Sequence, residues 1–232
     1  KLVSSQASQL LENCRKMIEV VDEPIADVSL PGMLALCEKA SKSFKVVLTG
    51  DGGDEQFFGY KRAINSYYLQ KILDPIFFIL PDRWNTVIKM AVVERIYRRL
   101  GGARYLSSDF KKLAGDNLFA GARNYANNSL IQILHKIDLF HFFPNKLANK
   151  SDRSSMAFGL ELRAPFLCKN LETRDYGSEN LRKFIISGKG KMNLRNLSKG
   201  YFSENISMSK KKGFVPPVSQ WLATDLSAWA HE

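Results

Sequence analysis

The stretch VVLTGDGGDEQFFGY, residues 46–60, joins an apolar, strand-like segment to a turn that is rich in both glycine and acid. Six consecutive positions of the turn hold three glycines and three carboxylates: Gly50, Asp51, Gly52, Gly53, Asp54 and Glu55. A glycine-rich turn after a strand commonly binds phosphate through its backbone N–H groups. Carboxylates, however, repel phosphate oxygens. The acidic turn therefore needs a different account of what it binds.

Three common loop motifs do not fit, because each lacks a required residue. A P-loop ends in Gly-Lys followed by Ser or Thr, whereas this turn ends in Gly-Asp-Glu. The dinucleotide fingerprint G-x-G-x-x-G is missing its third glycine. An EF-hand that began at Asp51 would need glycine at its sixth position, where Gln56 stands. A direct phosphate cradle and a calcium loop are both disfavoured.

Two chemical roles and one structural role for the turn stay open on the sequence alone. Mg²⁺ held by one or two carboxylates can bridge to phosphate oxygens, while the glycines let backbone N–H groups approach a nucleotide. A carboxylate here can also serve as a general base toward an attacking nucleophile. The structural alternative is an acidic first turn of the next helix, a place that suits Asp54 and Glu55.

The surrounding pattern predicts a mostly helical α/β fold. Predicted helices at 5–21 and 32–42 precede a predicted strand at 44–50, and the glycine turn follows, which is one unit of a parallel sheet. Periodic apolar residues predict further helices at these ranges: 83–100, 127–148, about 190–202 and 217–230. The 83–100 stripe includes Trp84 and Val87. Since one strand cannot make a sheet, we expect its partner strands outside this chain or on a partner protein.

Composition is that of an ordinary globular protein, with 45% hydrophobic and 25% charged residues. No stretch approaches the roughly 20 apolar residues of a membrane helix, and the apolar run PIFFILP at 75–81 is too short. The three cysteines form no Cys-x-x-Cys pair. The sequence therefore predicts a cytoplasmic protein without a membrane partner, a disulfide framework or a zinc site.

Net charge is +11, and the excess is concentrated late in the chain. Residues 182–212 contain a single acid, Glu204, against nine basic residues: Arg182, Lys183, Lys189, Lys191, Arg195, Lys199, Lys210, Lys211 and Lys212. Such a segment attracts polyanions such as ATP, pyrophosphate or nucleic acid, or is a solvated surface. Nucleic acid is disfavoured because aromatic residues are not interleaved with the cluster as a stacking platform requires.

Four blocks of sequence resemble the synthetase domain of glutamine-hydrolysing asparagine synthetases. The longest runs from DEPIADVSLPG to DEQFFGY at 22–60. The others follow in the family's order: NKSDRSSMAFGLELRAPFL at 149–167, GKMNLR at 190–195 and KKGFVPPVSQWL at 211–222. The resemblance implies an ATP-pyrophosphatase domain of adenine-nucleotide α-hydrolase type, of which residues 1–232 would be the C-terminal portion.

The activity that this resemblance implies is amide formation driven by ATP. ATP adenylates a substrate carboxylate with release of pyrophosphate, and an amine then displaces AMP. Aspartate is the expected carboxylate, and the nitrogen would come from glutamine through a glutaminase domain. Phe58 and Gln56 depart from the family pattern, which keeps a β-lactam synthetase or peptide cyclase reaction open. A homodimer is one assembly that the sequence leaves open.

The resemblance also implies roles for individual residues. Thr49, Gly50, Gly52 and Gly53 would contact the nucleotide, and Asp54 would bind Mg²⁺. Asp51 would lie near the attacking amine with Glu161 as its acidic partner, and Lys191 would stabilise the transition state and the departing pyrophosphate.

Simpler roles compete with two of these assignments. Glu161 alternates with Leu160 and Leu162, which suggests a carboxylate held among apolar neighbours, but a salt bridge to a nearby arginine is an equal alternative. Lys191 could be one more exposed lysine of the basic stretch.

Two parts of the family's machinery are not found in these 232 residues. One is the Ser-Gly-Gly-x-Asp-Ser loop that binds ATP, and the other is the glutaminase domain. We therefore expect a fragment or split product of a longer synthetase that is inactive by itself. The alternative is an interaction module left after loss of the ATP loop.

Overall fold

The computed structural model describes residues 7–22, 27–100, 124–168, 183–213 and 216–231. The chain forms two compact units. Unit 1 comprises Lys1–Asp51, Asn145–Pro165 and Lys210–Glu232, and unit 2 comprises Gly52–Pro144 and Phe166–Ser209. No helix among the described residues is long and apolar enough to span a membrane.

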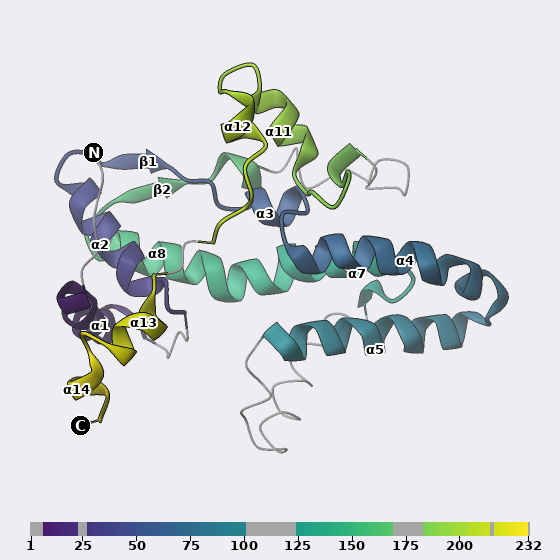
Figure 1. Ribbon diagram of the computed structural model, residues 1–232, viewed down its shortest axis with the longest axis horizontal. Helices are drawn as coiled ribbons and strands as arrows, with labels where there is room; N and C mark the ends of the chain where they lie inside the picture. The colour runs from purple at the N-terminus through teal and green to yellow at the C-terminus, as the bar shows by residue number, and fades with distance from the viewer. Residues whose placement is uncertain (1–6, 23–26, 101–123, 169–182, 214–215, 232) are drawn as a thin grey trace. The chain divides into compact units, whose positions relative to one another are not determined.

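Unit 1 is built on packed helices (Figure 1). Helix α1 (Ala7–Val20) packs against α2 (Leu30–Ser41), and α2 packs against α8 (Asn149–Met156). The short helices α13 (Val218–Ala223) and α14 (Ser227–His231) follow two prolines, as the sequence predicts. A small apolar cluster joins α1 to this end of the chain, and its two buried members are Leu10 and Leu226.

Unit 1 also contains a two-stranded parallel sheet. Strand β1 (Val46–Leu48) pairs with β2 (Glu161–Arg163), with Val46 opposite Glu161 and Leu48 opposite Arg163. The expectation that every partner strand lies outside this chain is therefore wrong. The second strand is only three residues long, too short for its alternation to be read as a strand signal.

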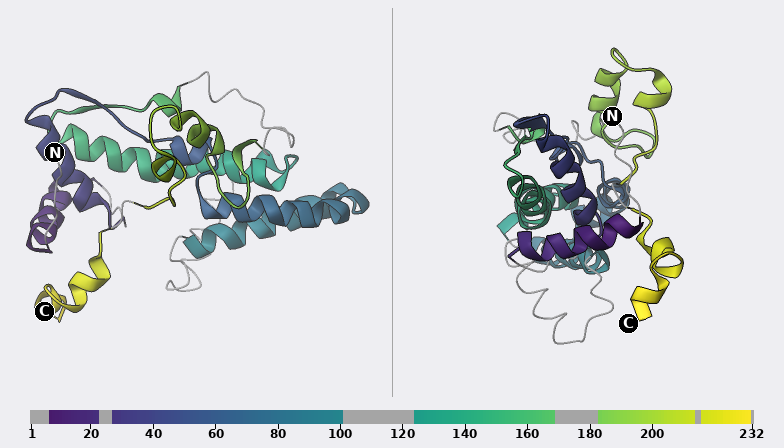
Figure 2. Two further views of the ribbon diagram at one scale, coloured as in Figure 1. Left: turned by 45° about the horizontal axis from the view of Figure 1, so that its top comes forward. Right: turned by 90° about the vertical axis from the view of Figure 1, so that its left-hand side faces the viewer.

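Unit 2 is organised around a helical hairpin. Helices α4 (Lys61–Ile79) and α5 (Asp82–Leu100) run antiparallel beside each other in both Figure 1 and Figure 2. The amide of Asn85 donates to the backbone oxygens of Phe77 and Leu80, at 2.8 and 3.2 Å, and so ties the two helices together at their connection. Sequence periodicity predicts α5 but not α4, because apolar residues surround α4 on all sides and Pro75 lies within it.

The core of unit 2 forms where α5 meets α7 (Leu130–Ile137). Its buried members are Val93, Tyr97, Leu130, Ile133, Leu134 and Ile137. Trp84 and Val87, which the sequence places on the apolar stripe of α5, are instead 50% and 57% exposed. The face of α5 that contacts α7 contains Val93 and Tyr97, so the packing partner decides which apolar positions are buried.

Helix α7 begins with a capping box. Ser129 Oγ accepts the backbone N–H of Gln132, and Gln132 Oε1 accepts the backbone N–H of Ser129. A π-helical segment, η3 (Asp138–Ala148), follows α7 directly. The helix predicted at 127–148 is thus confirmed as helical, with a wider winding in its second half.

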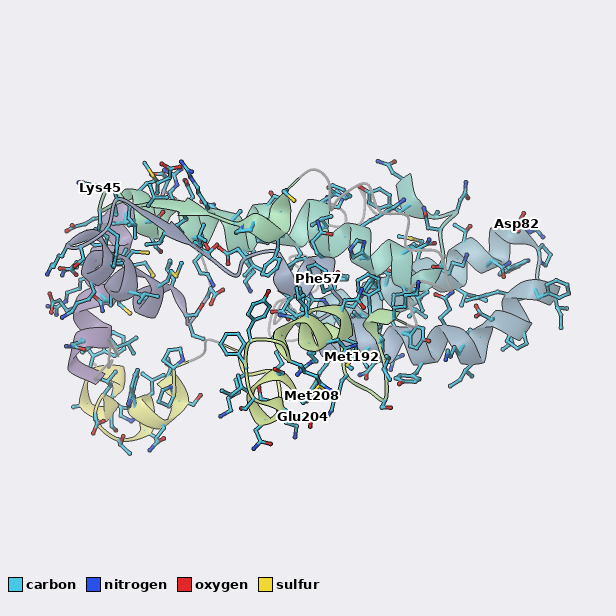
Figure 3. All side chains as sticks on the ribbon, turned by 90° about the horizontal axis from the view of Figure 1, so that it is seen from above. Lys45, Phe57, Asp82, Met192, Glu204 and Met208 are labelled. Atoms are coloured by element: carbon cyan, nitrogen blue, oxygen red, sulfur yellow. The ribbon has the colours of Figure 1, made fainter. Side chains whose placement is uncertain are left out.

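A second core cluster in unit 2 lies around the end of the acidic turn. Helix α3 (Gly53–Gln56) ends next to Phe57 and Phe58, which pack with Phe184 and Ile185. Helices α11 (Met192–Ser198) and α12 (Glu204–Ser207) occupy the range predicted at about 190–202 and slightly beyond it. The backbone of Phe57 contacts Lys191 directly before α11, and Figure 3 labels Phe57 and Met192 at this place.

Arg195 belongs to the basic segment and has a structural task in unit 2. Its guanidinium donates to the backbone oxygens of Gly190, Ser207 and Ser209, at 2.8–3.0 Å. Lys199 pairs with Glu204 at 3.2 Å. Two of the basic residues, Arg195 and Lys199, therefore hold this segment together. Arg182 lies outside the described residues.

Candidate active site

The second half of the acidic turn belongs to unit 2, where Gly52 lets the chain enter α3. Gly52 has a φ of 82°, a left-handed conformation that glycine adopts without steric cost. A Cβ at this position would also lie 2.3 Å from Leu167 Cδ2. Gln56 N–H donates to Gly52 O at 2.8 Å and closes the turn. The turn therefore needs glycine for both conformation and packing.

Asp54 and Lys191, which are far apart in the sequence, form an ion pair in unit 2. Lys191 Nζ lies 3.0 Å from Asp54 Oδ1, and the two side chains are 26% and 24% exposed. The backbone N–H of Lys191 also donates to Phe57 O at 2.9 Å. Lys191 is thus held at both ends beside the acidic turn, which contradicts the alternative of a solvated surface lysine.

Gly59 makes room for this ion pair, and Gly190 makes room for the backbone beside it. A Cβ on Gly59 would lie 1.9 Å from Asp54 Oδ1 and 2.3 Å from Lys191 Cε. A Cβ on Gly190 would lie 2.0 Å from Phe58 O. Real Cβ atoms do not approach other atoms so closely, so a side chain at either position would displace the pair or the backbone beside it. Neither Gly59 nor Gly190 is among the functional residues that the sequence predicts.

The Lys191 backbone is left-handed, with a φ of 59°, and Phe58 is left-handed with a φ of 55°. This conformation is costly for residues with a Cβ. The surrounding contacts that hold it are the Lys191 bonds to Phe57 and Asp54 and the burial of the Phe58 ring, which is 2% exposed. The Phe58 ring lies in the core against Phe184 and His135.

The first half of the turn, Thr49 to Asp51, belongs to unit 1 and follows β1. Thr49 N–H donates to Arg163 O at 2.8 Å and so extends the pairing of the two strands. Thr49 Oγ1 donates to Asp51 Oδ2 at 3.2 Å. A Cβ at Gly50 would meet no atom within 4 Å, so packing does not require glycine there, and the space beside its backbone is open.

Cys37 of α2 lies within electrostatic range of Asp51. Burial, with the negative charge of Asp51 as a second cause, raises the pKa of the Cys37 thiol to about 11. The thiol is therefore protonated and unreactive near neutral pH.

Glu161 lies on β2 and faces outward. Arg163 Nε donates to Glu161 Oε1 at 2.8 Å, and the Arg163 and Glu161 side chains are 64% and 56% exposed. The expectation of a carboxylate among apolar neighbours is not met, since successive strand residues point to opposite sides and buried Leu160 faces away from Glu161. The structure shows the salt-bridge alternative, and Glu161 is aligned with Val46 rather than with the turn after β1.

A buried polar network in unit 2 adjoins the acidic turn, and it is not among the sites predicted from the sequence. The Tyr60 hydroxyl donates a hydrogen bond to Glu55, whose side chain is nearly fully buried. Burial raises the pKa of the Glu55 carboxyl above its usual value, which the Tyr60 hydrogen bond partly offsets. The guanidinium of Arg62 stacks on the Tyr60 ring, 3.8 Å from its centroid, and pairs with Asp138 at 2.6 Å.

Asp138 also accepts a hydrogen bond from the Tyr97 hydroxyl at 2.5 Å, so the network joins four elements: α3, α4, α5 and η3. Its sequence signal is the tyrosine and arginine placed just after the aromatic pair of the turn, in DEQFFGYKR. The network fixes Glu55 and thereby α3, on which Asp54 lies.

The acidic turn suits a magnesium ion that takes most of its ligands from phosphate. Among the described residues, no three His, Cys, Asp or Glu side chains gather as a metal site. Glu55 is committed to Tyr60, which leaves Asp54 as the partly exposed carboxylate of α3. Mg²⁺ is commonly held in proteins by one or two carboxylates together with substrate phosphates. Asp54 fits that description.

Comparison with known proteins places the chain in a family. Residues 2–232 match the family described as Asparagine synthase. Over 99% of its length the chain is 24% identical to "Asparagine synthetase [glutamine-hydrolyzing] 1" of Bacillus subtilis, covering 39% of that protein. Over its full length it is 27% identical to proteins of Mycobacterium bovis and Mycobacterium tuberculosis named "Putative asparagine synthetase [glutamine-hydrolyzing]", covering 38% of each.

The chain belongs to the asparagine synthase family, because the family match spans nearly all of it. It spans about two fifths of the length of the curated relatives it matches. No solved structure matches it. The family expected from the four sequence blocks is confirmed, and the roles of the individual residues remain proposals.

Proposed function

We propose that this chain is part of an ATP-dependent amide ligase that adenylates a carboxylate, with aspartate as the first candidate substrate. The proposed reaction joins the carboxylate to the α-phosphate of ATP and releases pyrophosphate, and ammonia then displaces AMP to give the amide. The names of the curated relatives support glutamine as the ammonia source through a glutaminase domain.

The observation that carries the proposal is the Asp54–Lys191 ion pair. It joins the GDGGDE turn to the GKMNLR segment, two blocks on which the family resemblance rests. A carboxylate and an ammonium side by side, each about a quarter exposed, suit a ligand that carries both a metal ion and phosphate oxygens.

Each residue then has a proposed task. Asp54 would hold Mg²⁺, which when bound supplies positive charge to the phosphates. Lys191 would move its ammonium from Asp54 toward the phosphate oxygens as negative charge develops on them. Thr49, Gly50, Gly52 and Gly53 would contact the nucleotide through the turn. Asp51 would orient the attacking amine, and Glu161 would need to leave Arg163 to assist it.

The proposal extends to the fold and to the rest of the protein. We propose that residues 1–232 are the C-terminal portion of an ATP-pyrophosphatase domain of adenine-nucleotide α-hydrolase type. The support is the parallel β1–β2 pair followed by a glycine turn, since ligands of parallel α/β sheets bind beyond the carboxyl ends of the strands. The strongly exposed Leu48 on β1 is consistent with further protein covering this sheet.

The test is isotope exchange between pyrophosphate and ATP by the complete gene product with Mg²⁺ and aspartate. We expect Lys191→Met to lower the exchange rate by about 10²–10³, because a cation that acts mainly in the transition state is removed. ATP affinity should change little. Asp54→Asn should abolish exchange at ordinary Mg²⁺ concentrations, because the proposed carboxylate ligand is lost. A raised Mg²⁺ concentration should restore part of the exchange rate.

Lys189→Met is the matched control, since Lys189 is an exposed lysine two residues away. Equal and small effects of Lys189→Met and Lys191→Met would contradict a catalytic role for Lys191. Exchange that depends on another carboxylate and not on aspartate would keep the ligase chemistry and replace the substrate.

A further inference from the structure

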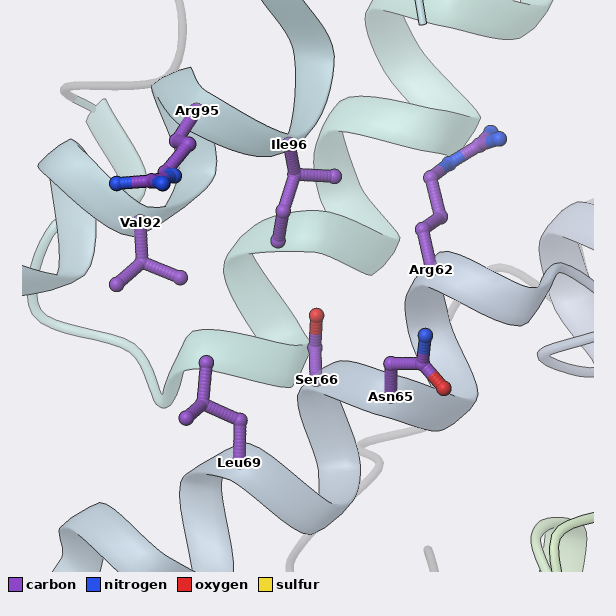
Figure 4. A pocket seen from close by; sticks show the side chains of 7 residues that line it. All are labelled: Arg62, Asn65, Ser66, Leu69, Val92, Arg95 and Ile96. Atoms are coloured by element: carbon purple, nitrogen blue, oxygen red, sulfur yellow. The ribbon is translucent and has the colours of Figure 1, made fainter. Parts of the chain in front are cut away.

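A cavity of about 410 Å³ lies between α4 and α5 in unit 2 (Figure 4). Its lining comes from both helices: Arg62, Asn65, Ser66 and Leu69 from α4, and Val92, Arg95 and Ile96 from α5. The volume is within the usual range for small-molecule sites in proteins. Neither the proposed ligase chemistry nor the family resemblance gives this cavity a task.

The floor of the cavity carries an unsatisfied polar atom. Ser66 Oγ has no hydrogen-bond partner among the described residues, although the residue is only 1% exposed. Figure 4 shows the Ser66 hydroxyl pointing into the space between the helices. A buried hydroxyl without a partner costs free energy, so it indicates a group that is supplied from elsewhere.

One cation on the wall of the cavity has no acidic partner. Arg95 forms no ion pair with any described residue, whereas Arg62 is engaged by Asp138 at 2.6 Å. A guanidinium presents a planar fork of N–H donors that matches a carboxylate. The exposed amide of Asn65 lies on the same lining and can add a further donor.

The remaining walls are aliphatic. Leu69 and Val92 point toward each other across the cavity, and Ile96 points in above Ser66 (Figure 4). Such walls favour a hydrocarbon body over an inorganic anion, because burying apolar surface is favourable and a bare phosphate or chloride offers none.

From this juxtaposition we propose that the α4–α5 cavity binds a small amphipathic carboxylate. Its carboxylate accepts hydrogen bonds from Ser66 and from Arg95, whose exposed guanidinium would turn inward to reach it, and its aliphatic body lies against Leu69, Val92 and Ile96. The proposal does not rest on the ligase activity, and its test measures binding alone.

The test uses the complete gene product with isotope-labelled Leu, Val and Ile methyl groups and hexanoate as the probe. We expect saturable NMR shifts of the methyl signals of Leu69, Val92 and Ile96. Acetate has the carboxylate but almost no hydrocarbon chain, and hexanol has the hydrocarbon chain but no charge. Each should bind about tenfold more weakly than hexanoate or worse, because one of the two interactions is lost.

Two variants and a matched control locate the binding. Arg95→Gln should weaken hexanoate binding by about tenfold, since a charge-assisted bond is removed. Ser66→Ala should weaken it severalfold. Arg83→Gln removes an exposed arginine at the other end of α5 and should change nothing. The absence of saturable shifts at these methyl groups, or equal losses in Arg83→Gln and Arg95→Gln, would overturn the proposal.

Discussion

At the scale of single residues, the glycines of the turn differ in what they do. Gly52 is needed because its backbone has a left-handed φ. Gly59 is needed because a Cβ there would overlap the charged side chains of Asp54 and Lys191. Neither reason applies to Gly50. A sequence pattern that counts glycines treats all three alike. Open space beside the Gly50 backbone is what a ligand-contacting glycine would show, so Gly50 remains a proposed nucleotide contact.

The first prediction concerns Gly59→Ala. The added Cβ would overlap Asp54 Oδ1 and Lys191 Cε, so the ion pair must open or the turn must shift. We expect exchange of pyrophosphate into ATP to fall by about tenfold or more, with ΔG of unfolding lower by about 1–3 kcal/mol. Gly200→Ala is the control, because a Cβ there would lie no closer than 3.6 Å to the Leu197 oxygen. Full exchange activity in Gly59→Ala would show that the pair need not keep this geometry.

The second prediction uses the left-handed Phe58. Removing its buried ring should cost about 3–5 kcal/mol, whereas relief of the left-handed backbone returns about 1–2 kcal/mol. Phe58→Gly should therefore be destabilised overall, yet be about 1 kcal/mol more stable than Phe58→Ala, which keeps the strain. Urea unfolding of both variants measures the difference. A more stable alanine variant would mean that the positive φ carries no strain.

At the scale of elements, α7 shows what the local sequence determines and what it leaves to tertiary contacts. The capping box at Ser129 and Gln132 is visible in the sequence and fixes where the helix begins. Its tertiary partners then determine which residues are buried, and they bury His135 with a ring centroid 4.9 Å from that of Phe58. Helix α4 is the opposite case, because its residues become helical without a clear amphipathic pattern and through contact with α7.

The third prediction follows from the burial of His135. Burial, and secondarily the positive charge of Lys136, lowers the pKa of His135 to about 4 from an ordinary value of 6.5. Above about pH 6.5 neither the folded nor the unfolded state binds the proton, and below it only the unfolded state does so until about pH 4. Stability should therefore fall as pH falls through this window, by about 2 kcal/mol at pH 5.

Urea unfolding of the 232-residue chain at neutral and acidic pH tests this dependence. In His135→Gln the loss between pH 7 and pH 5 should be smaller by about 2 kcal/mol, whatever the baseline stability of the variant. An unchanged slope would show that groups other than His135 cause the loss of stability in acid, and the buried Glu55 is not one of them, because a raised carboxyl pKa favours the folded state as pH falls.

At the scale of the whole molecule, two parallel strands make an incomplete sheet. Val46 and Leu48 on β1 are 42% and 74% exposed, whereas strands of parallel sheets are ordinarily covered on both faces. The chain also spans about two fifths of the length of its curated relatives. Both observations support the proposal that these residues work as part of a larger domain.

The fourth prediction is that the 232-residue chain alone, supplied with ATP, Mg²⁺ and aspartate, releases no pyrophosphate. These residues contain no Ser-Gly-Gly-x-Asp-Ser loop, so the main-chain cradle proposed for the triphosphate is not among them. A coupled pyrophosphate assay measures release, and the complete gene product is the positive control. Measurable turnover by the 232 residues would show that the Asp54–Lys191 pair and its turn suffice to bind and activate ATP.

The sequence by itself determined the family, the existence of most helices, and the acidic glycine turn after a strand. These depend on motifs and periodicities within short stretches, where neighbouring residues constrain one another directly. Only the tertiary structure decided that β2 pairs with β1, that Glu161 turns outward to Arg163, and that Lys191 reaches Asp54. It also placed the unpaired Ser66 hydroxyl and Arg95 on the lining of one cavity. Contacts between distant segments depend on how whole elements pack, and no local pattern in a single chain encodes that packing.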